Sequence, residues 1–152
     1  MIVVEGRTAT RLREDAVSNS ETATKIYEAF GRGDVAFILD QLDDEVAFEQ
    51  WSDNSSQAAG VPWMTPRTGP AGAGEFFAYV GANMEITDFQ VLDLLASDRQ
   101  VVVEVVIEAK LLATGASYRD EELHLWSFDE AGKVTRLRHY TDTAKHIAAA
   151  SA

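Results

Sequence analysis

The segment from Val101 to Leu112 constrains the fold more than any other part of the chain. Its apolar side chains recur at every second position, in the order Val103, Val105, Ile107, Ala109 and Leu111. The charged residues Glu104, Glu108 and Lys110 lie between them. Because successive side chains of a strand point to opposite faces, this pattern predicts a β-strand with an inward apolar face and an outward polar face.

The next segment places polar side chains on the same inward face. If Gly115 and Ala116 form a two-residue hairpin turn, directly opposed residues have numbers that sum to 231. The resulting pairs are Ala109 with Glu122, Ile107 with His124, and Val105 with Trp126. Glu122, His124 and Trp126 are then expected to point inward.

A second hairpin brings two histidines together. If Ala131–Gly132 closes it in the same way, His124 lies opposite His139 and Trp126 lies opposite Leu137. A one-residue slip would turn every side chain to the other face, so this interpretation depends on the register. The pattern predicts a polar site inside an apolar sheet face.

Composition limits the kind of protein. A chain of 152 residues with 46% hydrophobic content is long enough for one well-packed domain. Its formal net charge of −12 would repel phosphate backbones and anionic bilayers, so we expect neither nucleic acid nor membrane as a partner.

The absence of cysteine excludes disulfides, thiolate catalysis and cysteine-ligated zinc. No segment approaches the roughly 20 continuous apolar residues of a membrane span. The N-terminus also lacks the basic-then-apolar order of a signal peptide. We therefore expect a cytoplasmic protein.

The order of elements can be read from periodicity and capping signals. Residues 1–17 show little periodicity and are expected to form an N-terminal arm, followed by one domain over residues 18–152. Ser20 is predicted to cap the first helix, Gly31 to end it, and Asp34 to cap the second. The expected elements are helices at 21–30, 35–42, 70–79 and 143–150, a strand at 46–51, and strands beginning near 85, 100, 118 and 133.

Four stretches of the sequence resemble a known superfamily. They are Ile26–Asp34 (IYEAFGRGD), Asp43–Glu49 (DDEVAFE), Trp126–Val134 (WSFDEAGKV) and Arg138–Asp142 (RHYTD). With the order of elements, they resemble nuclear transport factor 2 and ketosteroid isomerase, and most of all the SnoaL-like branch that includes polyketide cyclases. The resemblance covers roughly residues 20 to 143. It implies a cystatin-like α+β fold, a cone-shaped α+β barrel in which three N-terminal helices pack on a strongly curved, mostly antiparallel sheet.

The resemblance also assigns expected roles. Glu49 falls where ketosteroid isomerase keeps its Asp general base, and His124 falls where that enzyme keeps the protonated Asp of its oxyanion hole. Ile26 falls where it keeps its essential Tyr, and Tyr27 is one position away. His139 stands where SnoaL cyclases keep their catalytic Asp.

The candidate catalytic residues are Glu49, Glu122, His124 and His139. One interpretation makes them an acid/base set, since imidazole suits proton transfer near neutral pH. The other makes the histidines neutral core groups hydrogen-bonded to Glu122 and Glu49. Glu49 could instead be an edge carboxylate paired with an arginine such as Arg67 or Arg138.

The candidate ligand-binding residues are mostly apolar. They are Ile26, Tyr27, Phe30, Trp51, Trp63, Val105, Ile107 and Trp126. Aromatic residues at such spacings also fill cores, so both interpretations stay open. Trp63 is the better ligand candidate, because it lies in a long loop over residues 52–69 that is rich in Ser, Gly, Pro and Asn.

We expect no metal and no cofactor. The four polar candidates could in principle bind a divalent ion, but they have neither HxH nor HExxH spacing.

Two hypotheses follow. In the first, the chain is an enzyme of the isomerase or cyclase type that moves a proton on a small, mostly apolar, carbonyl-containing molecule. Glu49 or His139 would abstract the proton, and His124, oriented by Glu122, would stabilise the enolate. In the second, the chain is a non-catalytic ligand-binding or dimerisation module of the same fold. In either case we predict a homodimer through the open face of the sheet.

Overall fold

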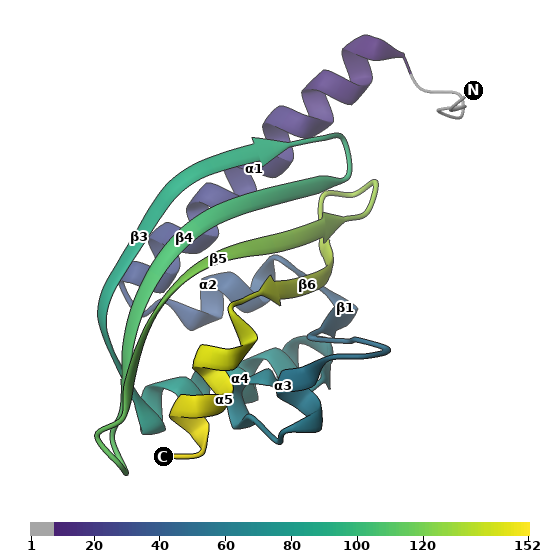
Figure 1. Ribbon diagram of the computed structural model, residues 1–152. Helices are drawn as coiled ribbons and strands as arrows, with labels where there is room; N and C mark the ends of the chain where they lie inside the picture. The colour runs from purple at the N-terminus through teal and green to yellow at the C-terminus, as the bar shows by residue number, and fades with distance from the viewer. Residues whose placement is uncertain (1–7) are drawn as a thin grey trace.

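A computed structural model of the chain describes residues 8–152 and shows a strongly curved sheet that wraps around helices (Figure 1). The elements are α1 Ala9–Gly31, α2 Val35–Asp40, β1 Leu42–Phe48, α3 Ser55–Ala58, the 3-10 turn η1 Pro62–Met64, β2 Arg67–Thr68, α4 Gly69–Asn83, β3 Met84–Ala96, β4 Gln100–Leu111, β5 Ser117–Phe128, β6 Val134–Tyr140 and α5 Thr143–Ala150. The six strands have the order β2-β1-β6-β5-β4-β3, and only β1 and β6 run parallel. This architecture confirms the predicted α+β fold with a mostly antiparallel sheet.

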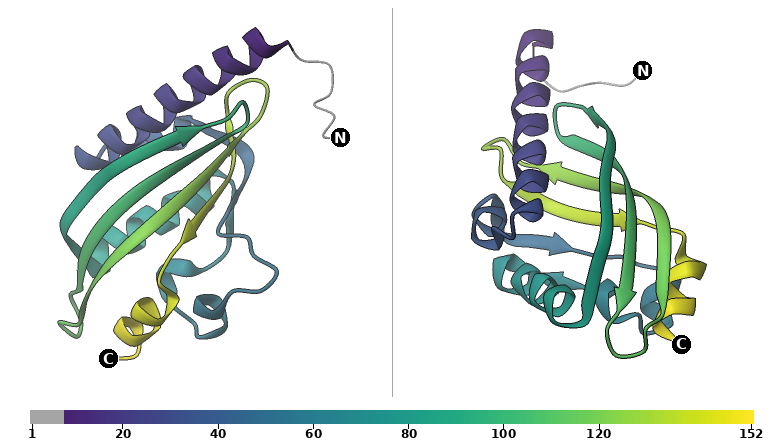
Figure 2. Two further views of the ribbon diagram at one scale, coloured as in Figure 1. Left: turned by 45° about the horizontal axis from the view of Figure 1, so that its top comes forward. Right: turned by 90° about the vertical axis from the view of Figure 1, so that its left-hand side faces the viewer.

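The first helix is longer than its sequence pattern indicates. It is capped by Thr8, whose side chain accepts a hydrogen bond from the Arg11 backbone N–H, and not by Ser20. The expected arm is therefore helical from Ala9 onward, while residues 1–7 lie outside the described residues. The N-terminal turns of α1 extend past the sheet (Figures 1 and 2), so they need no apolar stripe to pack against it.

The turn between the first two helices follows the prediction. Gly33 has a φ of 73°, and the Asp34 carboxylate accepts a hydrogen bond from the Phe37 backbone N–H at the start of α2. Within residues 8–152, no helix combines the length and apolar character that a bilayer crossing requires.

The core lies between the concave face of the sheet and helices α1, α2 and α4. Val103 and Val105 are fully buried, as the alternation in β4 predicts, and Glu104 between them is exposed. The helices contribute small and branched side chains such as Ala23 and Ile38. The buried apolar face of β4 therefore packs against the side chains that form the site.

The hairpin between β4 and β5 has a different register from the predicted one. His124 lies opposite Val103 and not Ile107, because the strands are joined by residues 112–116 and not by a two-residue turn at 115–116. The observed pairs are Val105 with Glu122, Val103 with His124, and Val101 with Trp126. The displacement is four residues, an even number, so every predicted inward side chain of β5 still points inward.

The hairpin between β5 and β6 confirms the predicted pairs. His124 lies opposite His139 and Trp126 lies opposite Leu137. A register shift between Ser127 and Phe128 absorbs the difference between the actual turn and a two-residue one.

The long loop after β1 is packed into the protein. It forms α3 and η1, and its residues Val61, Trp63 and Met64 are buried at 2%, 4% and 2% exposure. They pack in a second apolar cluster with Tyr118 of β5 and Ala149 of α5. Figure 2 shows α5 beside this loop at the same end of the molecule.

Candidate active site

A cavity of about 90 Å³ lies inside the cone, between the sheet and helices α1 and α4. Most of its lining is aromatic or aliphatic. Its polar lining residues are Tyr27, Tyr118, Glu122, His124, His139, Thr141 and His146. The volume is below the roughly 300 Å³ at which pockets for larger ligands begin, so the cavity has room for a small reactive group.

Six of the eight predicted ligand-binding residues line this cavity. They are Ile26, Tyr27, Phe30, Trp63, Ile107 and Trp126. The structure places the other two elsewhere. Val105 is a fully buried core residue beneath the site. Trp51 packs against Tyr140, with ring centroids 5.0 Å apart, and the Arg138 guanidinium lies 4.4 Å from the centre of its ring.

Glu49 explains why Trp51 turns away. The strand was expected to continue to Trp51, but β1 ends at Phe48, and Glu49 has a φ of 54°. A left-handed conformation at a residue other than glycine is uncommon and breaks the alternation of a strand. It directs the Glu49 carboxylate under the sheet, where the side chain is fully buried.

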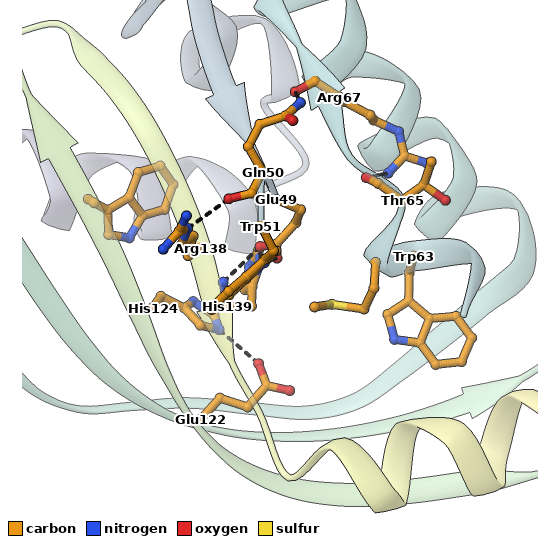
Figure 3. A network of polar contacts seen from close by, with 12 residues as sticks. Glu49, Gln50, Trp51, Trp63, Thr65, Arg67, Glu122, His124, Arg138 and His139 are labelled. Atoms are coloured by element: carbon orange, nitrogen blue, oxygen red, sulfur yellow. Dashed lines mark hydrogen bonds and ion pairs between the residues drawn. The ribbon is translucent and has the colours of Figure 1, made fainter. Parts of the chain in front are cut away.

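Both oxygens of the Glu49 carboxylate are occupied. Oε1 accepts hydrogen bonds from the backbone N–H of His139 at 2.7 Å and from its Nδ1 at 2.5 Å. Oε2 accepts from the Trp51 indole N–H at 2.8 Å. Glu49 is not part of the cavity lining and is not paired with Arg67 or Arg138. Its contacts make it the group that orients His139 (Figure 3).

The second ring nitrogen of His139 is Nε2. The ring lines the cavity and the side chain is 15% exposed. Nε2 has no hydrogen-bond partner within residues 8–152. Burial lowers the pKa of His139, but the charge and hydrogen bond of Glu49, together with the charge of Glu122, more than offset burial, so the pKa lies above its ordinary value. His139 is therefore an oriented imidazole with one nitrogen open to a ligand.

His124 has both nitrogens engaged. Its Nδ1 lies 2.6 Å from the Tyr27 hydroxyl, and its Nε2 lies 2.9 Å from Oε2 of Glu122. The Trp126 indole N–H donates to the Tyr27 oxygen at 3.0 Å. An indole only donates and a carboxylate only accepts, so the Tyr27 O–H donates to Nδ1 and the His124 proton resides on Nε2. His124 is thus a neutral imidazole.

The pKa values of His124 and His139 are shifted in opposite directions. Burial, and then the charge of His139, lowers the pKa of His124 to about 4. The two ring centroids are only 4.2 Å apart, so one imidazole at most is charged at a time. His139 has the higher pKa of the two, so it is the member of the pair that takes up a proton while His124 stays neutral.

Two functional residues were missed from the sequence. Nε2 of His146 in α5 lies 2.8 Å from Oδ2 of Asp120 and 3.1 Å from Oε1 of Glu122. Asp120 could have been found, because it continues the inward alternation of Glu122 and His124 by two residues. His146 gives no such signal, since it lies in a short alanine-rich helix whose position depends on the tertiary fold.

The three residues Asp120, Glu122 and His146 are also close enough to hold an ion, because their ligand atoms lie within 4.8 Å of one another. The surroundings do not fit a metal. A metal on Nε2 would leave the His146 proton on Nδ1, where the Trp63 indole N–H already donates at 2.9 Å. Two donors would then face each other. The single N–H on Nε2 of His146, which donates to Asp120 and lies 3.1 Å from Glu122, links the two carboxylates without an ion.

The low pKa of His124 predicts a loss of stability in acid. Below its ordinary pKa of 6.5, the unfolded chain binds a proton that the folded chain refuses until about pH 4. The free energy of unfolding should therefore fall by about 3 kcal/mol as the pH drops from 6.5 to 4, because of His124 alone. Urea unfolding of the unaltered protein and of His124→Gln across this range isolates the contribution. Parallel pH dependences in the two proteins would contradict it.

The curved sheet, its buried apolar face and the polar residues of the cavity together define a class of small α+β proteins with an internal cavity. Known proteins with similar sequences and structures belong to the same class of fold. The chain belongs to the SnoaL-like domain family, whose sequence profile matches residues 23–137. This confirms the resemblance derived from the sequence. The chain matches no curated protein significantly.

Solved structures show the same fold. A nuclear transport factor 2-like protein from Burkholderia xenovorans LB400 superimposes with a TM-score of 0.74 at 19% identity, covering 89% of this chain and 97% of that one. A candidate polyketide cyclase from Xanthomonas campestris has a TM-score of 0.66 at 19% identity, covering 90% and 98%. TerC, co-crystallised with polyporic acid, has a TM-score of 0.67 at 21% identity, covering 89% and 99%.

Proposed function

We propose that this protein binds a small, mostly apolar carbonyl compound and transfers a proton at the carbon next to the carbonyl. The observation that carries the proposal is the geometry of His139. Its Nδ1 is held by a buried carboxylate, and its Nε2 has no partner within residues 8–152 and belongs to a ring that lines the cavity. An imidazole held in this way by a carboxylate is the arrangement of a general base.

In the proposed reaction, Nε2 of His139 removes the proton and returns it to the same or another carbon. Glu49 keeps the ring oriented and stabilises the imidazolium that forms. Because both oxygens of Glu49 are already hydrogen-bonded, Glu49 itself does not meet the substrate.

The developing negative charge on the carbonyl oxygen needs a hydrogen-bond donor. His124 has no free N–H, so we assign this role to Tyr27, which lines the cavity; its O–H, which donates to Nδ1 of His124 in the free protein, would turn to the carbonyl oxygen when the ligand binds. Burial raises the pKa of Tyr27, so the phenol keeps its proton. The Trp126 indole N–H donates to the Tyr27 oxygen and keeps it in place while the hydroxyl proton turns.

The relatives support a carbonyl-containing substrate class. Two of the solved structures are named as candidate polyketide cyclases and another as a candidate isomerase. Polyketides are rich in carbonyl groups, and their cyclisation and isomerisation both begin with removal of such a proton.

The proposal is tested by proton exchange. A panel of small cyclic and aryl ketones is incubated with the protein in D₂O, and loss of the proton signal next to the carbonyl is followed by NMR. At least one ketone should exchange faster than with an equal concentration of free imidazole. If ketones bind but none exchanges faster, the catalytic proposal is wrong and the chain is a binding module.

A change at Glu49 should alter the pH dependence of exchange. The rate should rise with pH as His139 loses its proton, with a midpoint above the ordinary histidine value because Glu49 raises the pKa. Glu49→Gln keeps a hydrogen-bond acceptor for Nδ1 but removes the charge, so the midpoint should move to lower pH. The measurement is the exchange rate across about pH 5 to about pH 9 in both proteins. An unchanged midpoint would exclude Glu49 as the partner of the titrating group.

A further inference from the structure

A second hydrogen-bonded chain reaches Glu122 from the side of the molecule opposite to Tyr27. The Trp63 indole N–H donates to Nδ1 of His146 at 2.9 Å. Nε2 of His146 then lies 3.1 Å from Oε1 of Glu122, while His124 holds the other oxygen. His146 and Trp63 come from α5 and η1, and they are buried at 2% and 4% exposure.

The position of each proton in this series of hydrogen bonds follows from its donors and acceptors. The Trp63 indole can only donate, so Nδ1 of His146 must accept and the His146 proton resides on Nε2. That N–H points to the carboxylates of Glu122 and Asp120. Glu122 therefore receives the His124 N–H on Oε2, and on Oε1 it shares the His146 N–H, whose nearer acceptor is Oδ2 of Asp120. The two donor chains that begin at Trp126 and Trp63 converge on it.

We infer that Trp63 and His146 are positioning residues for the site: they keep Glu122 ionised, and thereby hold the His124 proton on Nε2 and direct the Tyr27 hydroxyl toward His124. If Glu122 gained a proton, it would donate to Nε2 of His124. The His124 proton would then move to Nδ1, and Tyr27 would lose its acceptor. The link from His146 to Tyr27 rests on structure alone; its effect on catalysis rests on the proposed function.

The charge balance around Glu122 supports this inference. Burial by itself raises the pKa of Glu122, but hydrogen bonds from His124 and His146 bring it well below its usual range. Without the His146 donor, the effect of burial would be opposed only by the His124 hydrogen bond and by the charges of His124 and His139. His146 lies beyond residue 137, where the family match ends.

Trp63 also favours the neutral form of His146 through its indole N–H. The charged groups that face His146 are Asp120 and Glu122, and the Tyr118 ring packs on it with centroids 4.4 Å apart. Burial lowers the pKa of His146, but the two carboxylates raise it overall. A charged ring would place a proton on Nδ1 against the Trp63 indole N–H, so the indole opposes protonation.

The first test replaces Trp63 with phenylalanine, which keeps an aromatic ring but removes the N–H donor. NMR of nitrogen-labelled protein distinguishes neutral imidazole from imidazolium at each ring nitrogen. In the unaltered protein, His146 should be neutral with its proton on Nε2. In Trp63→Phe it should carry protons on both nitrogens near neutral pH. If His146 remains neutral in the variant, Trp63 does not set its protonation state.

The second test compares His146→Phe, which removes the donor to Glu122, with His146→Gln, which retains an N–H donor. In His146→Phe, the His124 proton should move from Nε2 to Nδ1 as the pH falls from about 8 to about 5, because Glu122 becomes protonated. In His146→Gln it should stay on Nε2. Retention of the Nε2 proton throughout this range in His146→Phe would overturn the inference.

Proton exchange supplies the functional readout. In His146→Phe, Nδ1 of His124 stops accepting the Tyr27 proton as Glu122 becomes protonated, so kcat should depart from that of the unaltered protein as the pH falls from about 8 to about 5, with little change in KM. His146→Gln should follow the unaltered protein. Equal kcat values in all three proteins across this range would show that the chain through His146 does not set the hydrogen bond of Tyr27 for catalysis. No exchange in the unaltered protein would instead refute the proposed function, and the NMR results would still decide the inference.

Discussion

Replacing His139 with alanine is expected to lower the rate of ketone proton exchange by roughly 10²- to 10⁴-fold, the usual contribution of a general base. The loss should fall on kcat, because the apolar lining that binds the ligand is retained. Glu49 keeps its hydrogen bond from the backbone N–H of residue 139, so the carboxylate stays in place when the side chain is removed.

Rescue by free imidazole provides a control for His139→Ala. Removal of the imidazole enlarges the cavity at the position of His139, and added free imidazole should enter and restore part of the exchange rate. His139→Gln fills that space with a side chain that cannot act as a base, so imidazole should not restore its activity. Activity close to that of the unaltered protein in both variants would show that His139 is not the base.

Replacing Glu122 with alanine is expected to lower the free energy of unfolding by about 3 to 5 kcal/mol. Glu122 accepts the N–H of His124 and lies 3.1 Å from Nε2 of His146, and both imidazoles are buried. Without the carboxylate, the buried His124 N–H loses its acceptor, His146 retains only Asp120, and a cavity is left between the two rings. Urea unfolding followed by circular dichroism measures the change.

Two variants bracket this result. Glu122→Gln can accept one N–H but directs its own amide N–H at the other, so its cost should be smaller, about 1 to 3 kcal/mol. Glu121→Ala removes a carboxylate from the adjacent, exposed position of β5 and should change stability by less than about 0.5 kcal/mol. If Glu122→Ala were as mild as Glu121→Ala, the buried network would contribute little to stability.

Only part of the candidate site could be predicted from the sequence, because some of its features depend on strand periodicity and others on contacts between distant residues. The inward positions of Glu122, His124 and Trp126 followed from the two-residue period of a strand. They held although the predicted register of the first hairpin was wrong, since an even displacement preserves the face. The facing of His124 and His139 held because the second hairpin has the predicted pairing.

Other features depend on contacts between distant residues. The left-handed conformation of Glu49 is set by its burial beneath β6, and strand propensity gives no sign of it. The partner of Trp63 is 83 residues away in α5, so the loop sequence could indicate that the tryptophan is buried but not what it contacts. The early start of α1 was missed because its projecting turns carry no apolar stripe.

The sequence by itself determined the fold class, the inward face of the sheet, the capping of α2 by Asp34 and the family, because all of these depend on local periodicity and short motifs. Only the tertiary structure decided which nitrogen of each histidine carries the proton and which histidine is open to a ligand. A tautomer depends on the donors and acceptors around it. For His124, His139 and His146, they come from helix, strand and loop segments far apart in the chain.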